Sequence, residues 1–161
     1  MAPREINKGS RQAVLVMAMI DAWLSDDLPT LESLLDGVGS DYGEVFWILI
    51  VVFGGTIQAI ATASGQLFEN TLQSVLPQFA LKTGSDEAAE VARQALTAWS
   101  RGDDASIEEL NFNAELVRVG PEMVLLHFLA MLVDVGRSFA NHSGWSFEDI
   151  RSGWAQSLGA G

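Results

Sequence analysis

A long uncharged segment lies in the middle of the sequence. From Val45 to Ala63, nineteen consecutive residues carry no formal charge, and no other part of the chain is apolar over such a length. A helix of this kind either spans a membrane or lies at the centre of a helical protein. Its flanks carry acids (Asp41, Glu44 and Glu69) and lack the basic residues that usually anchor membrane spans. The segment is therefore predicted to be a buried or interface helix, and a membrane contact is not expected.

The two halves of the chain share a sequence pattern. Three pairs of segments match in the same order, namely Ala22-Trp23 with Ala98-Trp99, residues 30–34 with residues 106–110, and Ser64-Gly65 with Ser143-Gly144. An apolar helix is predicted in each half, over residues 44–65 and residues 122–141. We interpret this pattern as an internal duplication. The predicted fold is all-α, with about eight helices in two four-helix repeats that form one compact domain with an internal pseudo-two-fold axis.

The predicted domain organisation follows from this duplication. Residues 1–12 form a short flexible basic arm, and residues 13–158 form a single all-α domain. Repeat one covers residues 13–81 and repeat two covers residues 86–158. A chain of 161 residues is long enough to bury a substantial core.

Acidic pairs occur in the same inter-helix turn of each predicted repeat. Asp26-Asp27 and Asp103-Asp104 have too few neighbouring oxygens for a calcium site, so they are interpreted as helix caps. In the second repeat, Ser106 and Glu109 also have the spacing of a capping box. No metal site is predicted at these turns.

Composition excludes several functional classes. The net charge is −12, which repels nucleic-acid backbones, so a nucleic-acid partner is not expected. The chain contains no cysteine, which excludes thiol chemistry and is compatible with a reducing compartment, and a cytoplasmic location is predicted. No phosphate-binding loop or metal-ligand motif is present, and no cofactor is predicted.

The two predicted apolar helices differ on one face. In the second helix that face carries His127, Asp134 and Arg137, whereas the corresponding face of the first helix is apolar. An exposed apolar face usually marks a contact. We therefore predict a non-enzymatic protein–protein interaction module that forms a homo-oligomer, most simply a homodimer. The interface candidates are Leu49, Val52, Thr56, Ala59 and Ala63. The alternative is that this face meets the other repeat within one chain.

Two further functions stay open. A small apolar ligand could bind between the repeats, near His127, Asp134, Arg137, Trp145 and Trp154. An enzyme could use His127 with Asp134, although residues spaced along one helix face more often form a solvated polar stripe. His142 lies where the second helix is predicted to end, and there a structural role beside the helix dipole is favoured.

Overall fold

The computed structural model describes residues 8–38, 42–74, 86–111 and 121–159. All regular secondary structure in these ranges is α-helical, which confirms the predicted all-α class. The helices are α1 (Arg11–Leu24), α2 (Leu28–Asp36), α3 (Tyr42–Ser64), α5 (Asp86–Ser100), α6 (Asp104–Asn111), α8 (Pro121–Ser143) and α9 (Phe147–Leu158). A further helix is predicted over residues 66–80; residues 68–74 are helical, residues 66 and 67 are not, and residues 75–80 lie outside the described residues. Of the linker predicted at residues 82–86, residues 82–85 lie outside them as well, and Asp86 begins α5.

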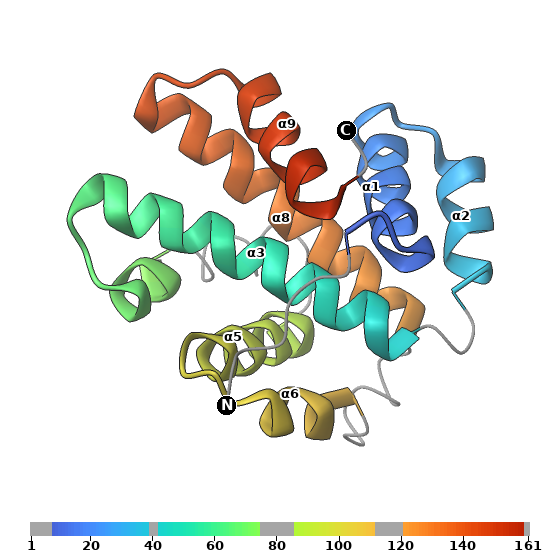
Figure 1. Ribbon diagram of the computed structural model, residues 1–161, viewed down its shortest axis with the longest axis horizontal. Helices are drawn as coiled ribbons and strands as arrows, with labels where there is room; N and C mark the ends of the chain where they lie inside the picture. The colour runs from blue at the N-terminus through green and yellow to red at the C-terminus, as the bar shows by residue number, and fades with distance from the viewer. Residues whose placement is uncertain (1–7, 39–41, 75–85, 112–120, 160–161) are drawn as a thin grey trace.

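Helix α3 runs through the centre of the fold (Figure 1). It contacts α1, α5, α6 and α8. Residues 45–50 are all buried, so its first half is covered on every side. Beyond Thr56 one face becomes exposed, because Gln58, Ala59, Thr62 and Ala63 lie at the surface. The uncharged segment is therefore a core helix over its first half and a surface helix over its second.

Helix α3 has the composition and length of a membrane span, yet most of it is covered by the chain itself. Among the described residues it is the one helix that is long and apolar enough to cross a bilayer. In its most apolar stretch, 67% of the residues are buried inside the fold. Its predicted ends are close to those observed, with Glu44 in the first turn and Gly65 just beyond Ser64.

Helices α1 and α9 are joined by an ion pair. The Arg151 guanidinium of α9 donates two hydrogen bonds to the Asp21 carboxylate of α1, at 2.8 and 2.9 Å. Asp21 is the acid that interrupts the apolar pattern of α1, and this pair is the reason that it is tolerated there. The residues just before α1 also meet the end of α9, since the Gly9 amide donates to the Leu158 carbonyl at 2.8 Å.

The start of α1 involves part of the predicted basic arm. Ser10 caps the helix, because its side chain accepts from the Ala13 amide at 3.1 Å. Residues 11 and 12 belong to the first turn of α1. Residues 8–12 are therefore part of the fold, and residues 1–7 of the predicted arm lie outside the described residues.

The turns after α1 and α5 have the same backbone geometry. The Asp27 amide donates to the Ala22 carbonyl at 3.0 Å, and the Asp103 amide donates to the Ala98 carbonyl at 2.9 Å. The residue before each aspartate is left-handed, with φ of 54° at Asp26 and 68° at Gly102. These bonds close the C-terminal end of each helix in the same way.

The same two aspartates cap the helices that follow, as predicted. The carboxylate of Asp27 accepts from the Thr30 amide at 3.3 Å, and that of Asp103 accepts from the Ser106 amide at 3.2 Å. The Ser106 hydroxyl also donates to Asp103, and these bonds lower the pKa of the Asp103 carboxyl. The predicted capping box of Ser106 and Glu109 is wrong, because Asp103 occupies the capping position and Ser106 donates to it.

Two tryptophans lie against glycines of neighbouring helices. The Trp99 ring of α5 covers Gly54 of α3, and a Cβ built on Gly54 would overlap that ring. The Trp154 ring of α9 covers Gly136 of α8, where a Cβ would lie 2.7 Å from the ring. These contacts bring helix backbones close together, which only glycine allows.

Replacing Asp26 with glycine is expected to raise the free energy of unfolding by about 0.5–1 kcal/mol, because glycine adopts a positive φ without steric cost. Urea denaturation measures the change. Asp26→Asn removes the same charge and retains a side chain, so it separates charge from backbone conformation. A loss of stability in Asp26→Gly would show that the side chain stabilises this turn.

Adjacent glycines in α3 provide a matched pair of substitutions. Gly54→Ala is expected to destabilise the protein by about 1–3 kcal/mol, because the new methyl group overlaps Trp99. Gly55→Ala meets nothing within 4 Å and is expected to stabilise the helix by about 0.5–1 kcal/mol. Thermal unfolding of both variants checks this difference, and equal effects would contradict the Trp99 contact.

Candidate binding groove

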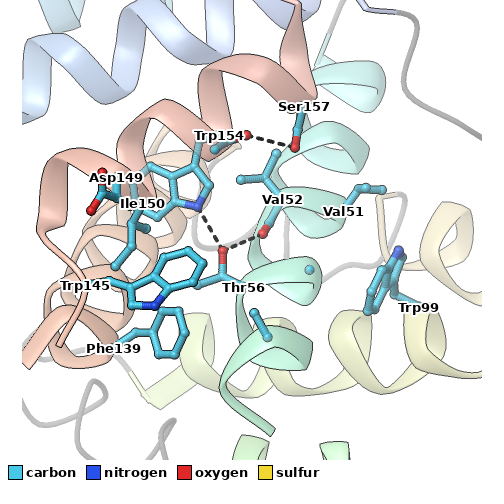
Figure 2. Close-up of a pocket in the computed structure, with 13 residues that line it drawn as sticks. Val51, Val52, Thr56, Trp99, Phe139, Trp145, Asp149, Ile150, Trp154 and Ser157 are labelled. Atoms are coloured by element: carbon cyan, nitrogen blue, oxygen red, sulfur yellow. Dashed lines mark hydrogen bonds between the residues drawn. The ribbon is translucent and has the colours of Figure 1, made fainter. Parts of the chain in front are cut away.

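An open groove lies along the exposed half of α3. Its inner part is a cavity of about 370 Å³ between α3, α9 and Trp99 of α5 (Figure 2). Its outer part is a wider hollow of about 850 Å³ that reaches Ser64 at the end of α3. The two parts share Gly55, Ala59, Phe139 and Trp145, so they form one continuous depression. We call this depression the α3 groove.

The floor of the α3 groove consists mainly of small residues. Gly55, Ala59 and Ala63 lie four residues apart on α3, so they follow one face of the helix. A Cβ built on Gly55 would meet nothing within 4 Å, so the space above it is open. Small side chains at this spacing allow another backbone to approach α3 closely.

The inner wall is fixed by Trp154 of α9. Its indole Nε1 donates to the Thr56 hydroxyl at 2.9 Å, and that hydroxyl donates to the Val52 carbonyl at 2.8 Å (Figure 2). The Phe147 ring meets the Trp154 ring edge to face, with 5.9 Å between the centroids. Because every polar atom in this chain of bonds is buried and paired, the wall has one favoured arrangement.

The outer wall is aromatic and largely open to solvent. Trp145 follows Gly144 in the turn between α8 and α9, and its exposed fraction is 59%. Its ring packs on Phe139 of α8, with 6.1 Å between the centroids. Such a large exposed aromatic beside an apolar depression is typical of a contact anchor.

Of the described residues that line the α3 groove, Asp149 alone has a titratable side chain. It lies in the first turn of α9 and forms a capping box with Ser146. One carboxylate oxygen, Oδ2, accepts from the Ser146 amide at 3.2 Å, and the Ser146 hydroxyl accepts from the Asp149 amide at 3.1 Å. Ile150, the next residue, contributes an apolar side chain to the lining.

The predicted interface residues divide between the core and the α3 groove. Leu49 is buried in the core, with an exposed fraction of 1%. Val52 and Thr56 are buried where α9 covers α3. Ala59 and Ala63 are exposed on the groove floor. Two members of the predicted set are therefore accessible to another molecule.

The structure brings together part of the predicted ligand pocket. Trp145 and Trp154 both line the α3 groove. Asp134 is half-buried on α8. The Arg137 guanidinium carbon lies 5.7 Å from the centroid of the Phe147 ring. Neither Asp134 nor Arg137 lines the groove. The side chains of His127 and His142 lie outside the described residues.

The groove residues that sequence reasoning missed include Trp99, Phe139 and Asp149. Trp99, which matches Trp23 in the repeat pattern, reaches α3 because Gly54 makes room for its ring. Phe139 lies in the groove with its ring packed on Trp145, a contact that no local sequence pattern indicates. Asp149 lies three residues after Ser146, and this capping-box spacing is a sequence signal that could have identified it.

The described residues that line the α3 groove are mainly apolar or small. Its polar groups are Asp149, the paired hydroxyl of Thr56, Ser157 and the side chains at the outer end of α3. Within the described ranges, no three or more His, Asp or Glu side chains gather as metal ligands. Comparisons with protein-family models, curated proteins and solved structures give no match for this chain.

Replacing Thr56 with valine is expected to destabilise the protein by about 1–3 kcal/mol, because the buried Trp154 Nε1 loses its acceptor. The shape of the side chain is nearly unchanged. Thr71→Val is the control, since the buried Thr71 hydroxyl accepts no such bond and donates to the nearby Leu67 carbonyl. Equal losses of stability in urea denaturation would show that the Trp154 bond contributes nothing specific.

Proposed function

We propose that this protein is a non-enzymatic helical interaction module that binds an apolar α-helical segment of a protein partner in the α3 groove. The observation that carries the proposal is the exposed second half of α3, which has an uncharged floor of small residues beside the exposed Trp145. Helix-in-groove recognition uses this arrangement, in which one apolar helix face lies in a hydrophobic depression.

The dimensions of the α3 groove favour a helix over a compact ligand. The exposed floor extends along α3 from Gly55 to Ser64, which corresponds to about 14 Å at the usual helical rise of about 1.5 Å per residue. About two and a half turns of a second helix have a similar length. The groove is also open to solvent along its outer part, so a long segment can enter from the side.

The predicted duplication is part of this proposal. The matched turns at Asp26-Asp27 and Gly102-Asp103 support two repeats, because two hydrogen bonds and the left-handed residue of one turn have counterparts in the other. Under this interpretation α3 belongs to repeat one, and the α8–α9 wall belongs to repeat two. The α3 groove would then lie between the repeats.

A small apolar ligand is the second candidate. Its support is the inner cavity of about 370 Å³, a size within the range of small-molecule sites, between Trp99 and Trp154. The length of the ligand distinguishes the two functions. A helix-binding groove gains affinity as the bound peptide lengthens to several turns. An isolated cavity instead binds a compact apolar molecule such as N-phenyl-1-naphthylamine, and a long peptide does not weaken that binding.

A neutral probe peptide tests the proposed function. The probe is an 18-residue helix of leucine, alanine and glutamine with one apolar face. It is expected to bind the wild-type protein and to lose at least about tenfold in affinity to Ala59→Arg, because the new cation fills and charges the uncharged floor. Tryptophan fluorescence and calorimetry report binding, and circular dichroism checks that the variant is folded.

Gln156→Arg is the matched control, since Gln156 is exposed on α9 and does not line the groove. This variant is expected to bind the peptide like the wild type. Failure of the wild-type protein to bind the peptide, or equal binding by Ala59→Arg, would overturn the proposal. Binding of N-phenyl-1-naphthylamine at full stoichiometry that the peptide does not reduce would favour the small-ligand function.

A further inference from the structure

We propose that the partner helix carries a positive charge near one end, which Asp149 and Trp145 bind at the rim of the α3 groove. This inference rests on the proposed function and specifies the chemistry of the partner. The partner is then an amphipathic helix of a different protein, with an apolar face and a lysine or arginine at its end.

The charge distribution supports a cationic partner. The chain has a net charge of −12, so its long-range field attracts cations. The floor of the groove contributes no charge to this field, because α3 carries none beyond Glu44. Asp149 is the titratable side chain among the described residues of the lining, so it is the charge that a bound helix would meet.

The local geometry around Asp149 also favours a cation. Oδ2 is held by the Ser146 amide, which fixes the position of the carboxylate at the groove. Glu148, the neighbouring acid in the same first turn of α9, pairs with the Arg151 guanidinium at 3.6 Å, so the negative charge offered at the groove is that of Asp149. A full carboxylate charge exceeds the partial positive charge of about 0.5 at a helix N-terminus. The exposed ring of Trp145 lines the same cavity, and an aromatic face attracts guanidinium and ammonium groups.

The groove helix of a second copy of this chain does not supply the required cation. The exposed part of that helix is uncharged, and there is no lysine or arginine from Gln12 to Leu81. A second copy also brings another net charge of −12, which opposes association at low salt. The charge pattern therefore favours a basic partner over the homodimer predicted from the sequence.

Two probe peptides that differ in one group test this inference. Both are 18-residue helices of leucine, alanine and glutamine, and one carries a single arginine near its end where the other carries the neutral isostere citrulline. The arginine peptide is expected to bind about 3- to 10-fold more tightly at low salt. This ratio is expected to approach 1 at about 0.5 M salt, because the pair is exposed to solvent.

Asp149→Asn assigns the effect to the proposed residue. Asparagine keeps an oxygen that accepts from the Ser146 amide, and the ratio of the two affinities is expected to fall to about 1. Asp27→Asn is the matched control, because Asp27 also caps a helix and does not line the groove. It removes the same charge, and the wild-type ratio should persist.

The possible outcomes separate this inference from the proposed function. Equal binding of both peptides by the wild-type protein would overturn the cationic partner and leave the groove as a helix site. No binding of either peptide would overturn both. A loss of the ratio in Asp27→Asn would assign it to net charge and overturn the role of Asp149. Light scattering that shows a homodimer, dissociated by Ala59→Arg, would show that a second copy occupies the groove.

Discussion

The fold depends on covering α3. A helix that is apolar around its whole circumference cannot be stabilised by a single neighbour, because each uncovered side leaves apolar surface in water. Residues 45–50 meet this requirement, since α1, α5 and α8 lie against α3 and all six side chains are buried. In the second half of α3, the described part of the chain leaves one helix face exposed. The α3 groove lies along this face, where apolar residues continue beyond the helices that cover them.

Two tryptophan–glycine contacts set how closely the other helices approach. Trp99 lies over Gly54, and Trp154 lies over Gly136. The Trp154 ring also donates its buried hydrogen bond to Thr56, so one side chain determines the position of α9 relative to both α8 and α3. A groove wall fixed in this way keeps its shape without a ligand, which reduces the entropy lost when a partner binds.

The sequence predicts the helices better than it predicts their neighbours. The extent of α3, the acidic caps at Asp27 and Asp103 and the helical class follow from local patterns that act within a few residues. Ser106 and Glu109 have the spacing of a capping box, but the turn before α6 places Asp103 first, and a single acceptor is sufficient. Local rules do not decide between two caps that would begin the helix at different residues.

The groove was predictable only in part for a similar reason. Helical periodicity places Leu49, Val52, Thr56, Ala59 and Ala63 on one face, but it cannot show which helix covers which turn of that face. Trp154 covers the middle of the face because its hydrogen bond to Thr56 requires close packing, and this partner lies 98 residues away along the chain. Gly55 is left open, since a Cβ built on it would meet nothing within 4 Å.

Under the proposed function, charge and apolar surface have separate roles in the α3 groove. Burial of apolar surface would supply most of the affinity for a helix, and this contribution has little orientational preference along the uncharged floor. A single carboxylate at the rim adds a small amount of free energy, but it distinguishes the two directions in which a helix can lie. Asp149 is fixed by its capping bonds to Ser146, so this preference is built into the wall before any partner arrives. An apolar helix with a cation at the wrong end would lose the contact with Asp149 but would still bury its apolar face. The charge therefore controls the orientation of the bound helix more than its affinity.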